Sequence, residues 1–590
     1  MTAASSKPET RIQGIGVSPG ISWGLVEILG NALEEPEEIS IAMSEVAGET
    51  DRLSMALVAT REQITALQQE IIAEDAENSA AIFDAHLLLL EDATVLKEVK
   101  KITETQLKNI DWAYYSVVKR YIDSLRKIAD PYLRERAVDI EDVAKRVLSN
   151  LRWSSHGTAP GQLSSHTNIV LAHDLTPSDT VSMDRTKVRG FATEVGSQTS
   201  HTAIMARSLN IPAVVALHKI PEACSTGDIA IIDGHHGVVI LNPAPNTQLE
   251  YEALAEKERQ VVSGLDNLKD SPTETADGVN VTLSANLEFL EELKGVADKG
   301  AEGVGLYRTE FFYLSKQELR SEENQTANYR EVAEATAPHG VIIRTLDIGG
   351  DKMCPELYST PEPNPFLGWR GIRLSLDRPA DFRIQLRSIL QASAFGKVRV
   401  MFPFISTLEE IQRSKQHLES AKNELRDQKI PFDEAIEVGA MIEIPSAVMI
   451  ADHIAQEVDF FSIGTNDLIQ YTTAVDRIND RVASLYQPTH PAVIALIRET
   501  VEAAHRNNIW CGICGEAASD LRMTPIWVGL GVDELSVGSA QLLKIRHAIS
   551  KLDSSACGKF VEQLRAYGTA GEIERHCTSF AKDFYPDLFI

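Results

Sequence analysis

The sequence predicts a multidomain α/β protein in which a helical block interrupts a small α/β domain and an eight-stranded (β/α)8 barrel follows. Residues 40–149 have a helical pattern of apolar residues with hardly any glycine or proline. Short apolar runs bounded by Gly, Asp and Pro follow in residues 155–242, and eight more begin at about residue 275. A chain of 590 residues is too long for one core, so we expect about two to four domains.

The helical block is predicted from the spacing of its apolar residues. These fall on one helical face: Leu53, Leu57, Ile64, Leu67 and Ile71. Many Glu, Asp and Lys residues lie between them, which is typical of a helical bundle with acidic, solvated faces. We place this inserted domain at residues 36–152.

The α/β domain is predicted on both sides of the insertion, at residues 1–35 and 153–245. Its expected buried strands are Ile169–Ala172, Ile229–Ile232 and Val238–Leu241. A helix is expected over Thr202–Leu209. Residues 248–268 are rich in Glu, Lys, Gln and Leu, so we predict a linker helix within residues 246–274.

The barrel domain, residues 275–590, is predicted from the number of its strands. The expected strands are Val279–Ala285, Gly303–Leu306, Val341–Ile343, Val398–Phe402, Val438–Ile442, Phe460–Ile463, Trp510–Ile513 and Glu534–Val537. Most pairs are separated by helix-forming segments, and eight βα units in roughly 300 residues are typical of a TIM barrel.

Polar residues lie just past the ends of these runs. They are Asn286, Arg308, Arg344, Glu443, Asn466, Asp467 and Cys514. Functional residues of a TIM barrel gather at the C-terminal ends of its strands, so this placement predicts one shared site.

The chemistry of these residue types indicates a phosphorylated anionic ligand. Arg308 and Arg344, with Arg370 from a long loop, provide guanidinium groups that match phosphate and carboxylate oxygens. Glu443 and Asp467 are hard oxygen ligands suited to Mg²⁺ that also binds substrate phosphate. The alternative is that each arginine forms an ordinary salt bridge with an acid.

Cys511 and Cys514 have the C-x-x-C spacing of a thioredoxin-like pair. However, residues i and i+3 of a strand point to opposite faces, so only Cys514 is expected to reach the barrel mouth. There it could act as an acid or a nucleophile, and the alternative is a buried, inert cysteine.

His201 follows Gly196-Ser-Gln-Thr-Ser200 and is expected in the first turn of a helix. Backbone N–H groups and the helix dipole would stabilise a phosphate on its ring there. The alternative is a capping-region histidine without a chemical role. His235 and His236, in Asp233-Gly-His-His-Gly237, are predicted to lie in an exposed turn.

The composition excludes several classes of protein. The net charge of −28 argues against nucleic acid or an anionic membrane as the main partner and favours a basic partner protein. Residues 1–11 lack a signal-peptide core, and the apolar run Ala85–Leu90 is too short to span a bilayer. Six scattered cysteines indicate no disulfide framework, so a reducing cytoplasm is expected.

Several motifs, in order, resemble those of phosphoenolpyruvate-utilising enzymes. They are Thr199-Ser-His-Thr-Ala-Ile-Met-Ala-Arg207, Gly305-Leu-Tyr-Arg-Thr-Glu310, Arg344-Thr-Leu-Asp-Ile-Gly-Gly-Asp-Lys352, Asn364-Pro-Phe-Leu-Gly-Trp-Arg-Gly-Ile-Arg373, Phe461-Ser-Ile-Gly-Thr-Asn-Asp-Leu468 and Cys511-Gly-Ile-Cys-Gly-Glu516. Gly14-Ile-Gly-Val-Ser-Pro-Gly20, Ala81-Ile-Phe-Asp-Ala-His86 and Asp130-Pro-Tyr-Leu-Arg-Glu-Arg136 narrow the resemblance to the enzyme I group of the phosphoenolpyruvate:sugar phosphotransferase system. The resemblance begins at about residue 12 and covers nearly all that follows.

The resemblance implies a phosphotransferase and a role for each matching residue. His201 would carry the phosphoryl group on a swivelling phosphohistidine domain, with Thr180 supporting its ring. The ligand would be held by Arg308, Arg344, Arg370, Asn466, Asp467 and Arg477, with Lys352 adding positive charge. Glu443 and Asp467 would bind Mg²⁺, or Mn²⁺ in its place, and Cys514 would protonate the enolate to give pyruvate. The helical insertion would bind the phosphocarrier protein HPr, and the barrel would form a homodimer.

Other members of the family and other classes of protein would require different features of the chain. Pyruvate phosphate dikinase and phosphoenolpyruvate synthase need a long upstream ATP-binding domain. The nitrogen-type paralogue usually has an additional N-terminal sensory domain. Neither of these two domains is expected in this chain. A non-catalytic scaffold would not need His201, Glu443, Asp467 and Cys514 together. A thiol–disulfide oxidoreductase would form a Cys511–Cys514 disulfide.

The sequence departs from the family pattern at two places. Ser197-Gln198 stands where Gly-Arg is common, and Ser519 stands in place of a commoner Gly.

Overall fold

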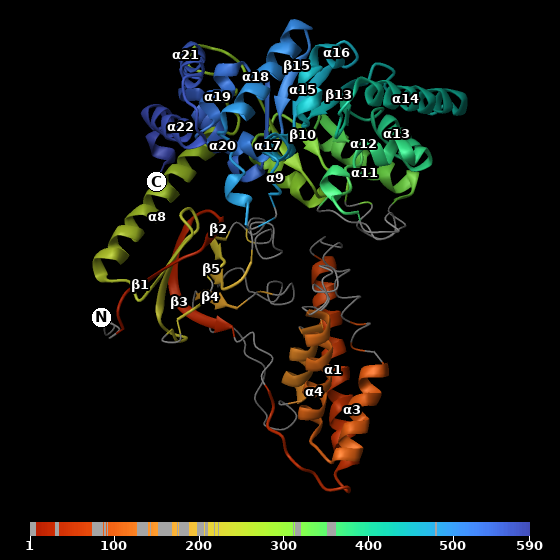
Figure 1. The fold of residues 1–590 in the computed structure, drawn as a ribbon, viewed down its shortest axis with the longest axis vertical. Helices are drawn as coiled ribbons and strands as arrows, with labels where there is room; N and C mark the ends of the chain where they lie inside the picture. Colours follow the sequence, from red (N-terminus) through yellow and green to blue (C-terminus); the bar gives the residue numbers. More distant parts are fainter. Residues whose placement is uncertain are drawn as a thin grey trace. The chain divides into compact units, whose positions relative to one another are not determined.

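The computed structural model describes most of the chain in two compact units, Met1–Glu258 and Arg259–Ile590. The described residues are 7–29, 35–73, 87, 90, 93–126, 140–141, 143–151, 168–173, 175, 188–196, 206, 211–217, 219–221, 224–310, 312, 320–350, 362–477, 479 and 481–589. Figure 1 labels the helices and strands used below.

The first unit contains an eight-stranded sheet with the order β1-β8-β7-β3-β4-β5-β6-β2. Its strands are β1 (Thr10–Gln13), β2 (Ile15–Ser18), β3 (Ile21–Leu29), β4 (Asn168–Ala172), β5 (Val188–Thr193), β6 (Ala213–Val215), β7 (Ile229–Asp233) and β8 (Val238–Leu241). Strands β3 to β6 run parallel, and the remaining pairs are antiparallel. Apolar side chains on both faces of the sheet form two separate clusters.

The three strands expected here are confirmed as β4, β7 and β8, to within one residue at each end. Strands β1, β2, β3, β5 and β6 were not predicted. Their apolar runs are short or interrupted, as by Arg189 and Gly190 in β5. The helix expected over Thr202–Leu209 lies outside the described residues, apart from Ala206.

Between β3 and β4 the described chain is helical, as expected. The helices are α1 (Val46–Ala73), α3 (Ala93–Gln106) and α4 (Ile110–Arg126), and residues 143–151 are helical too. They share a core of fully buried side chains that includes Leu53, Val99, Val117 and Val147. The linker helix is α8 (Pro245–Leu265), which begins three residues before the predicted 248–268 segment.

The second unit is built on a closed barrel of eight parallel strands, in the order β10-β11-β12-β13-β14-β15-β16-β9. The strands are β9 (Thr282–Leu287), β10 (Val304–Tyr307), β11 (Val341–Arg344), β12 (Val398–Phe402), β13 (Glu437–Ile442), β14 (Phe460–Ile463), β15 (Trp510–Ile513) and β16 (Glu534–Val537). All eight predicted strands are confirmed. The first starts three residues later than predicted, because Val279 accepts a hydrogen bond from the backbone of Thr275 in a preceding turn.

Helices surround the barrel strands (Figure 1). They are α9 (Leu293–Asp298), α11 (Glu322–Ala335), α12 (Ile372–Asp377), α13 (Pro379–Ala392), α14 (Leu408–Gln428), α15 (Pro445–Met449), α16 (Ala451–Ala455), α17 (Thr465–Thr473), α18 (Pro491–Arg506), α19 (Thr524–Leu530), α20 (Leu542–Lys551), α21 (Ser554–Leu564) and α22 (Ala570–Phe584).

The barrel has a large apolar layer between strands and helices and a smaller cluster inside. The inner cluster consists of Leu306, Ile342, Met401, Met441, Phe460 and Cys514. Within the described residues, none of the helices has the length and apolar content needed to cross a membrane.

Candidate active site

The C-terminal ends of the barrel strands carry most of the predicted site residues. Arg308, Glu443 and Cys514 directly follow β10, β13 and β15, and Arg344 is the last residue of β11. Asn466 and Asp467 lie in the first turn of α17, directly after β14.

Asn286 differs from its predicted position. It lies within β9 rather than past its end. Its side-chain amide donates a hydrogen bond to the carbonyl of Cys514 (3.3 Å) and accepts one from the Ser536 hydroxyl (2.8 Å). It therefore links β9 to the neighbouring strand β16 and to the end of β15, one strand further round the barrel.

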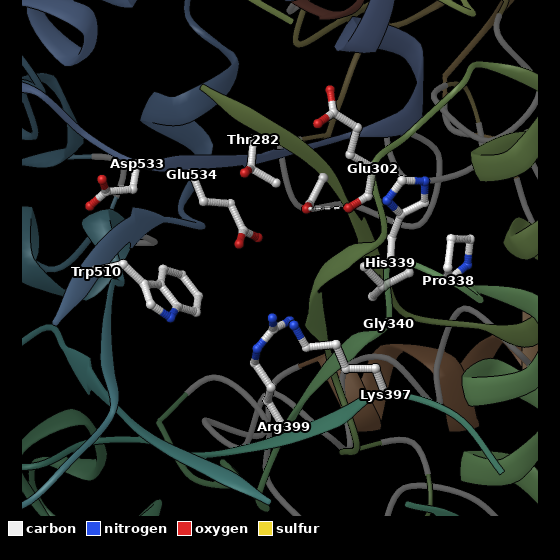
Figure 2. Close-up of a pocket in the computed structure, with 12 residues that line it drawn as sticks. Thr282, Glu302, Pro338, His339, Gly340, Lys397, Arg399, Trp510, Asp533 and Glu534 are labelled. Carbon is white, nitrogen blue, oxygen red and sulfur yellow. Dashed lines mark hydrogen bonds between the residues drawn. The ribbon is translucent and has the colours of Figure 1, made fainter. Parts of the chain in front are cut away.

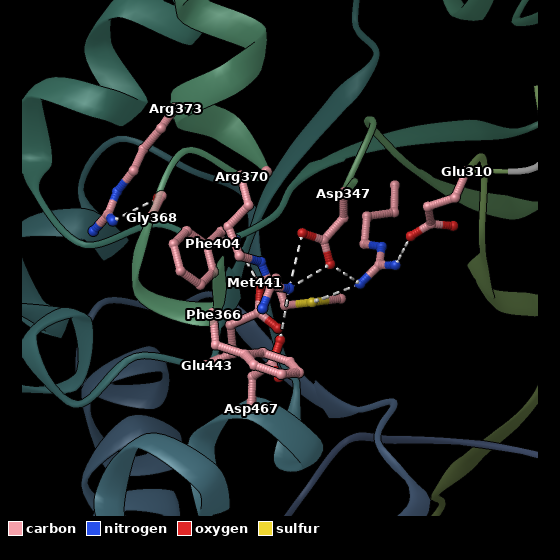
Figure 3. A network of polar contacts seen from close by, with 12 residues as sticks. Glu310, Asp347, Phe366, Gly368, Arg370, Arg373, Phe404, Met441, Glu443 and Asp467 are labelled. Atoms are coloured by element: carbon pink, nitrogen blue, oxygen red, sulfur yellow. Dashed lines mark hydrogen bonds and ion pairs between the residues drawn. The ribbon is translucent and has the colours of Figure 1, made fainter. Parts of the chain in front are cut away.

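Arg344 and Arg370 are both buried and both paired with acids. Figure 3 shows Arg370 with Asp347 and Asp467 beside it. Asp347 joins them, since its two oxygens lie 2.9 Å from Arg344 Nη1 and 3.1 Å from Arg370 Nη2. Arg344 also pairs with the buried Glu310, and Arg370 with Asp467 (3.0 Å). The salt-bridge alternative therefore holds for these two arginines, but the pairs form one network rather than isolated bridges.

Aromatic residues fix the position of Arg370. Its guanidinium carbon lies 4.4 Å from the Phe404 ring centroid, and Nη1 donates to the Tyr471 hydroxyl (3.2 Å). The next residue, Gly371, has φ of 54°, and a Cβ there would lie 2.6 Å from that of Phe404. A side chain at position 371 would therefore push Phe404 away from Arg370.

Phe404 itself adopts a strained backbone conformation. Its φ of 58° lies in the left-handed region, which costs a non-glycine residue about 1–2 kcal/mol. In this conformation its backbone N–H donates a 2.6 Å hydrogen bond to Glu443. The strain thus orients a carboxylate of the site.

Three buried carboxylates converge beside the arginines. Asp347, Glu443 and Asp467 each offer an oxygen, and these oxygens all lie within 4.8 Å of one another. Burial, together with the negative charges of Asp467 and Asp347, raises the pKa of Glu443 to about 8. A divalent cation would relieve this repulsion, and three carboxylate oxygens suit a hard cation such as Mg²⁺. These residues fit a metal.

The sequence prediction named two of the three acids and missed Asp347. Asp347 comes three residues after Arg344, at the same strand end and within a motif that had been singled out. Its position at a barrel strand end was the signal that could have identified it. Glu310, Phe404 and Tyr471 were missed as well.

The other predicted ligand-binding residues lie around this network. Arg477 Nη1 is 3.3 Å from Asp467, and Asn466 accepts a hydrogen bond from the backbone N–H of Glu516 (2.9 Å). Arg308 is partly exposed, and its 3.4 Å contact is with the exposed Glu288. The structure therefore brings Arg344, Arg370, Arg477, Glu443 and Asp467 into one network, with Asn466 in the same helical turn as Asp467.

Cys511 and Cys514 pack in different places, as the strand period predicts. Cys514 belongs to the cluster inside the barrel, whereas Cys511 packs in the layer between strands and helices. Both are free thiols, which does not favour the oxidoreductase alternative. Burial raises the pKa of Cys514 to about 11 despite nearby Ser462 and Arg344, so its thiol is protonated at neutral pH.

His201, Thr180 and Lys352 lie outside the described residues. His235 and His236 are exposed in the turn between β7 and β8, as predicted. There Asp233 accepts hydrogen bonds from both backbone N–H groups and pairs with the His236 ring (2.9 Å).

Comparison with protein families finds three matching domain models. Residues 13–136 match "PEP-utilising enzyme, N-terminal", residues 164–237 match "PEP-utilising enzyme, mobile domain", and residues 262–554 match "PEP-utilising enzyme, PEP-binding domain". The last range contains the barrel site, and the second contains His201 and Thr180.

Curated proteins match over nearly their full length. The phosphoenolpyruvate-protein phosphotransferase of Geobacillus stearothermophilus is 42% identical over 565 residues, 96% of this chain and 97% of that protein. Proteins of the same name match from Bacillus subtilis strain 168 (41% identity, 95% and 98% of the two chains) and Staphylococcus carnosus strain TM300 (40%, 95% and 98%).

Proposed function

Because this chain belongs to the phosphoenolpyruvate-utilising enzyme family, and within it to the phosphoenolpyruvate-protein phosphotransferases, we propose that it phosphorylates its own His201 from phosphoenolpyruvate. Phospho-His201 would then pass the phosphoryl group to a histidine of HPr, as the first step of sugar uptake. The observation that carries the proposal is the buried network of arginines and carboxylates at the C-terminal ends of the barrel strands.

The arginines suit a ligand that has both a phosphate and a carboxylate. The Nε groups of Arg344 and Arg370 are buried and have no hydrogen-bond partner among the described residues, so each is a donor that a ligand oxygen could satisfy. Among the described residues Arg308 forms an ion pair with the exposed Glu288, an interaction worth about 0–1 kcal/mol that a ligand would easily replace. We assign Arg308, Arg344, Arg370, Asn466, Asp467 and Arg477 to binding phosphoenolpyruvate, with Lys352 adding charge.

Glu443 and Asp467 would hold Mg²⁺, or Mn²⁺ in its place. Asp347 lies close enough to provide a third carboxylate ligand to the cation, or to hold Arg344 and Arg370 in position beside the cation. When bound, the cation would neutralise charge on the phosphoryl oxygens.

The phosphoryl step breaks the P–O bond of phosphoenolpyruvate and forms a P–N bond on the neutral ring of His201, with Thr180 supporting the ring. The remaining enolate needs a proton at carbon to become pyruvate. The Cys514 thiol is protonated at neutral pH and lies among the inner side chains of the barrel, which suits a proton donor. Water would then restore its proton.

His201 precedes the linker helix α8 in the chain, and the phosphoenolpyruvate site follows it. We therefore propose that the phosphohistidine domain (residues 1–35 and 153–245) swivels, so that His201 meets each partner in turn. The linker would span residues 246–274 and the barrel domain residues 275–590.

The helical domain, residues 36–152, is the proposed HPr-binding domain. Met55 and Val58 of α1 are 58% and 57% exposed, and together with Ser54, Ala59 and Glu62 they line a shallow groove. Exposed apolar side chains beside acidic ones suit a basic partner protein with an apolar centre.

We further propose a homodimer that forms through the barrel domain. Leu367, Met449 and Leu485 are 65%, 75% and 58% exposed, and a second copy would cover such side chains. A cytoplasmic location accords with the five described cysteines, all of which are free thiols.

The test follows phosphate-radiolabelled phosphoenolpyruvate in the presence of Mg²⁺, with and without HPr. Wild type and the control His236→Ala, an exposed histidine of the β7–β8 turn, should gain acid-labile label and pass it to HPr, whereas His201→Ala should gain none. If wild type remains unlabelled, the proposal is wrong and a scaffold without catalytic activity becomes the better account. Label retained in His201→Ala would place the phosphohistidine elsewhere.

A further inference from the structure

A polar cavity lies at the N-terminal end of the barrel, opposite the strand ends that carry the candidate active site. Its volume is about 430 Å³, within the range of about 300–1,000 Å³ typical of small-molecule sites. It is lined by residues at the starts of five strands: Thr282 of β9, Val304 of β10, Arg399 of β12, Trp510 of β15 and Glu534 of β16. Figure 2 shows four of them, Thr282, Arg399, Trp510 and Glu534.

Glu534 is a buried carboxylate in this cavity. Its neighbour Gly305 makes room for it, because a Cβ at position 305 would lie 2.2 Å from Glu534 Oε1. The Ser284 hydroxyl lies beside the carboxylate and lowers its pKa, but it donates its hydrogen bond to the backbone carbonyl of Glu302 (3.3 Å). Among the described residues no cation forms an ion pair with Glu534. Its negative charge is therefore only partly compensated.

Two cations, Lys397 and Arg399, line the same cavity. Both are paired with the same acid: Arg399 Nε lies 2.6 Å and Lys397 Nζ 3.8 Å from Glu437. Two positive charges therefore share one negative charge. The lining of the cavity thus carries the two cations Lys397 and Arg399 as well as the carboxylate of Glu534.

The other acids around the cavity already have partners. Asp533 pairs with His505 (2.9 Å) and accepts a hydrogen bond from the backbone of Cys511 (2.8 Å). Glu302 accepts a hydrogen bond from the Thr273 hydroxyl (2.5 Å) and lies 3.6 Å from Arg546. In Figure 2 both carboxylates point away from the space between Glu534 and Arg399.

We propose that this cavity binds a small α-amino acid. The ligand's carboxylate would lie against Lys397 and Arg399, and its ammonium group against Glu534. A simple anion would be repelled by Glu534, and a simple cation would be repelled by Lys397 and Arg399. Only a ligand with both charges therefore matches the acidic and the basic residues of the cavity. The Trp510 ring, which stacks on Phe460 at 4.5 Å and has the Arg399 guanidinium carbon 5.5 Å from its centroid, would contact the rest of the ligand.

The site does not depend on the proposed phosphotransferase reaction, because it shares no residue with the candidate active site. The position of the cavity at the N-terminal end of the barrel also supports a ligand. In TIM barrels this end normally serves stability, which a buried acid without an ion-pair partner among the described residues does not favour. A ligand that pairs with Glu534 gives that acid a role.

Binding can be tested with the full chain by thermal shift and calorimetry, using the proteinogenic amino acids one at a time. At least one should raise the melting temperature of wild type at up to about 10 mM, where a Kd near 1 mM would give clear stabilisation. Lys397→Ala and Glu534→Gln should each weaken that binding by about tenfold or more, which is about 1.4 kcal/mol. Lys559→Ala, an exposed lysine on α21, is the matched control and should bind as wild type does.

Two derivatives of the same amino acid test the charge argument. The N-acetyl compound lacks the ammonium group and the amide lacks the carboxylate, so neither should bind at the same concentration. The inference is wrong if no amino acid binds wild type, or if Lys397→Ala and Glu534→Gln both leave binding unchanged. Equal binding of the N-acetyl compound would also overturn it, since the site would then recognise a carboxylate alone.

Discussion

Glu534 should make the barrel less stable as the pH rises, and Glu534→Gln should remove this dependence. The pKa of this carboxyl is raised from its ordinary value of 4.5 to about 7, chiefly by burial; Ser284 and Arg399 oppose the rise, and Glu302 and Asp533 add to it. Glutamine has nearly the same shape, and its amide can still hydrogen-bond to Ser284 but carries no charge. The substitution therefore isolates the cost of a buried negative charge.

The magnitude follows from the difference in pKa between the folded and unfolded states. Below the unfolded value of 4.5 the carboxyl is protonated in both states, and Glu534 imposes no charge penalty. As the pH rises to about 7, the unfolded state releases its proton first, so the free energy of unfolding falls. The difference of about 2.5 units corresponds to about 3 kcal/mol, and the loss is complete above pH of about 7.

The assay is urea denaturation of wild type and Glu534→Gln at about pH 4.5 and about pH 8.5, followed by tryptophan fluorescence of the barrel. The variant should be more stable than wild type by up to about 3 kcal/mol at the higher pH, with little difference at the lower pH. Glu562→Gln is the control, because this side chain is 62% exposed and should change stability by no more than about 0.5 kcal/mol.

A difference between the two proteins that does not change with pH would refute the charge argument. So would a variant that is less stable than wild type at the higher pH. The first result would mean that Glu534 is well compensated when ionised, and the second that its ionised form stabilises the fold.

Three further predictions concern single residues. Cys514→Ala should slow pyruvate formation on the order of 100-fold in a coupled lactate dehydrogenase assay, whereas Cys511→Ala should keep its turnover because that thiol packs outside the barrel. Asp347→Asn should weaken Mg²⁺ binding about tenfold or more by calorimetry; unchanged affinity would remove Asp347 from the oxygen set. Gly305→Ala should lower stability by about 1–3 kcal/mol in thermal denaturation, because the new Cβ would lie 2.2 Å from Glu534 Oε1 and 2.7 Å from the Cβ of Ser536; if Glu534→Ala in the same chain relieves none of the loss, the clash with Glu534 is not its cause.

The sequence alone determined the parts of this protein whose signal is local. The eight barrel strands were recognisable because each is a short apolar run bounded by residues that break regular structure, and polar residues at their ends indicated the site. Cys511 and Cys514 were separated correctly because the side-chain direction along a strand alternates with a period of two. Strands such as β5 and β6 were missed because Gly190 interrupts one and the other has only three residues.

Only the tertiary structure decided which residues meet. Asp347 became a candidate metal ligand because closure of the barrel brings the end of β11 beside Glu443 and Asp467; its place near a strand end was visible in the sequence, but the distances among the three acids were not. Phe404 orients Glu443 through a backbone conformation that its residue type does not favour. At the N-terminal end of the barrel, nothing in the sequence around Glu534 distinguishes it from other acids at the start of a strand. Its charge becomes significant only because the folded barrel buries it without a paired cation among the described residues, and burial is a property of the whole fold.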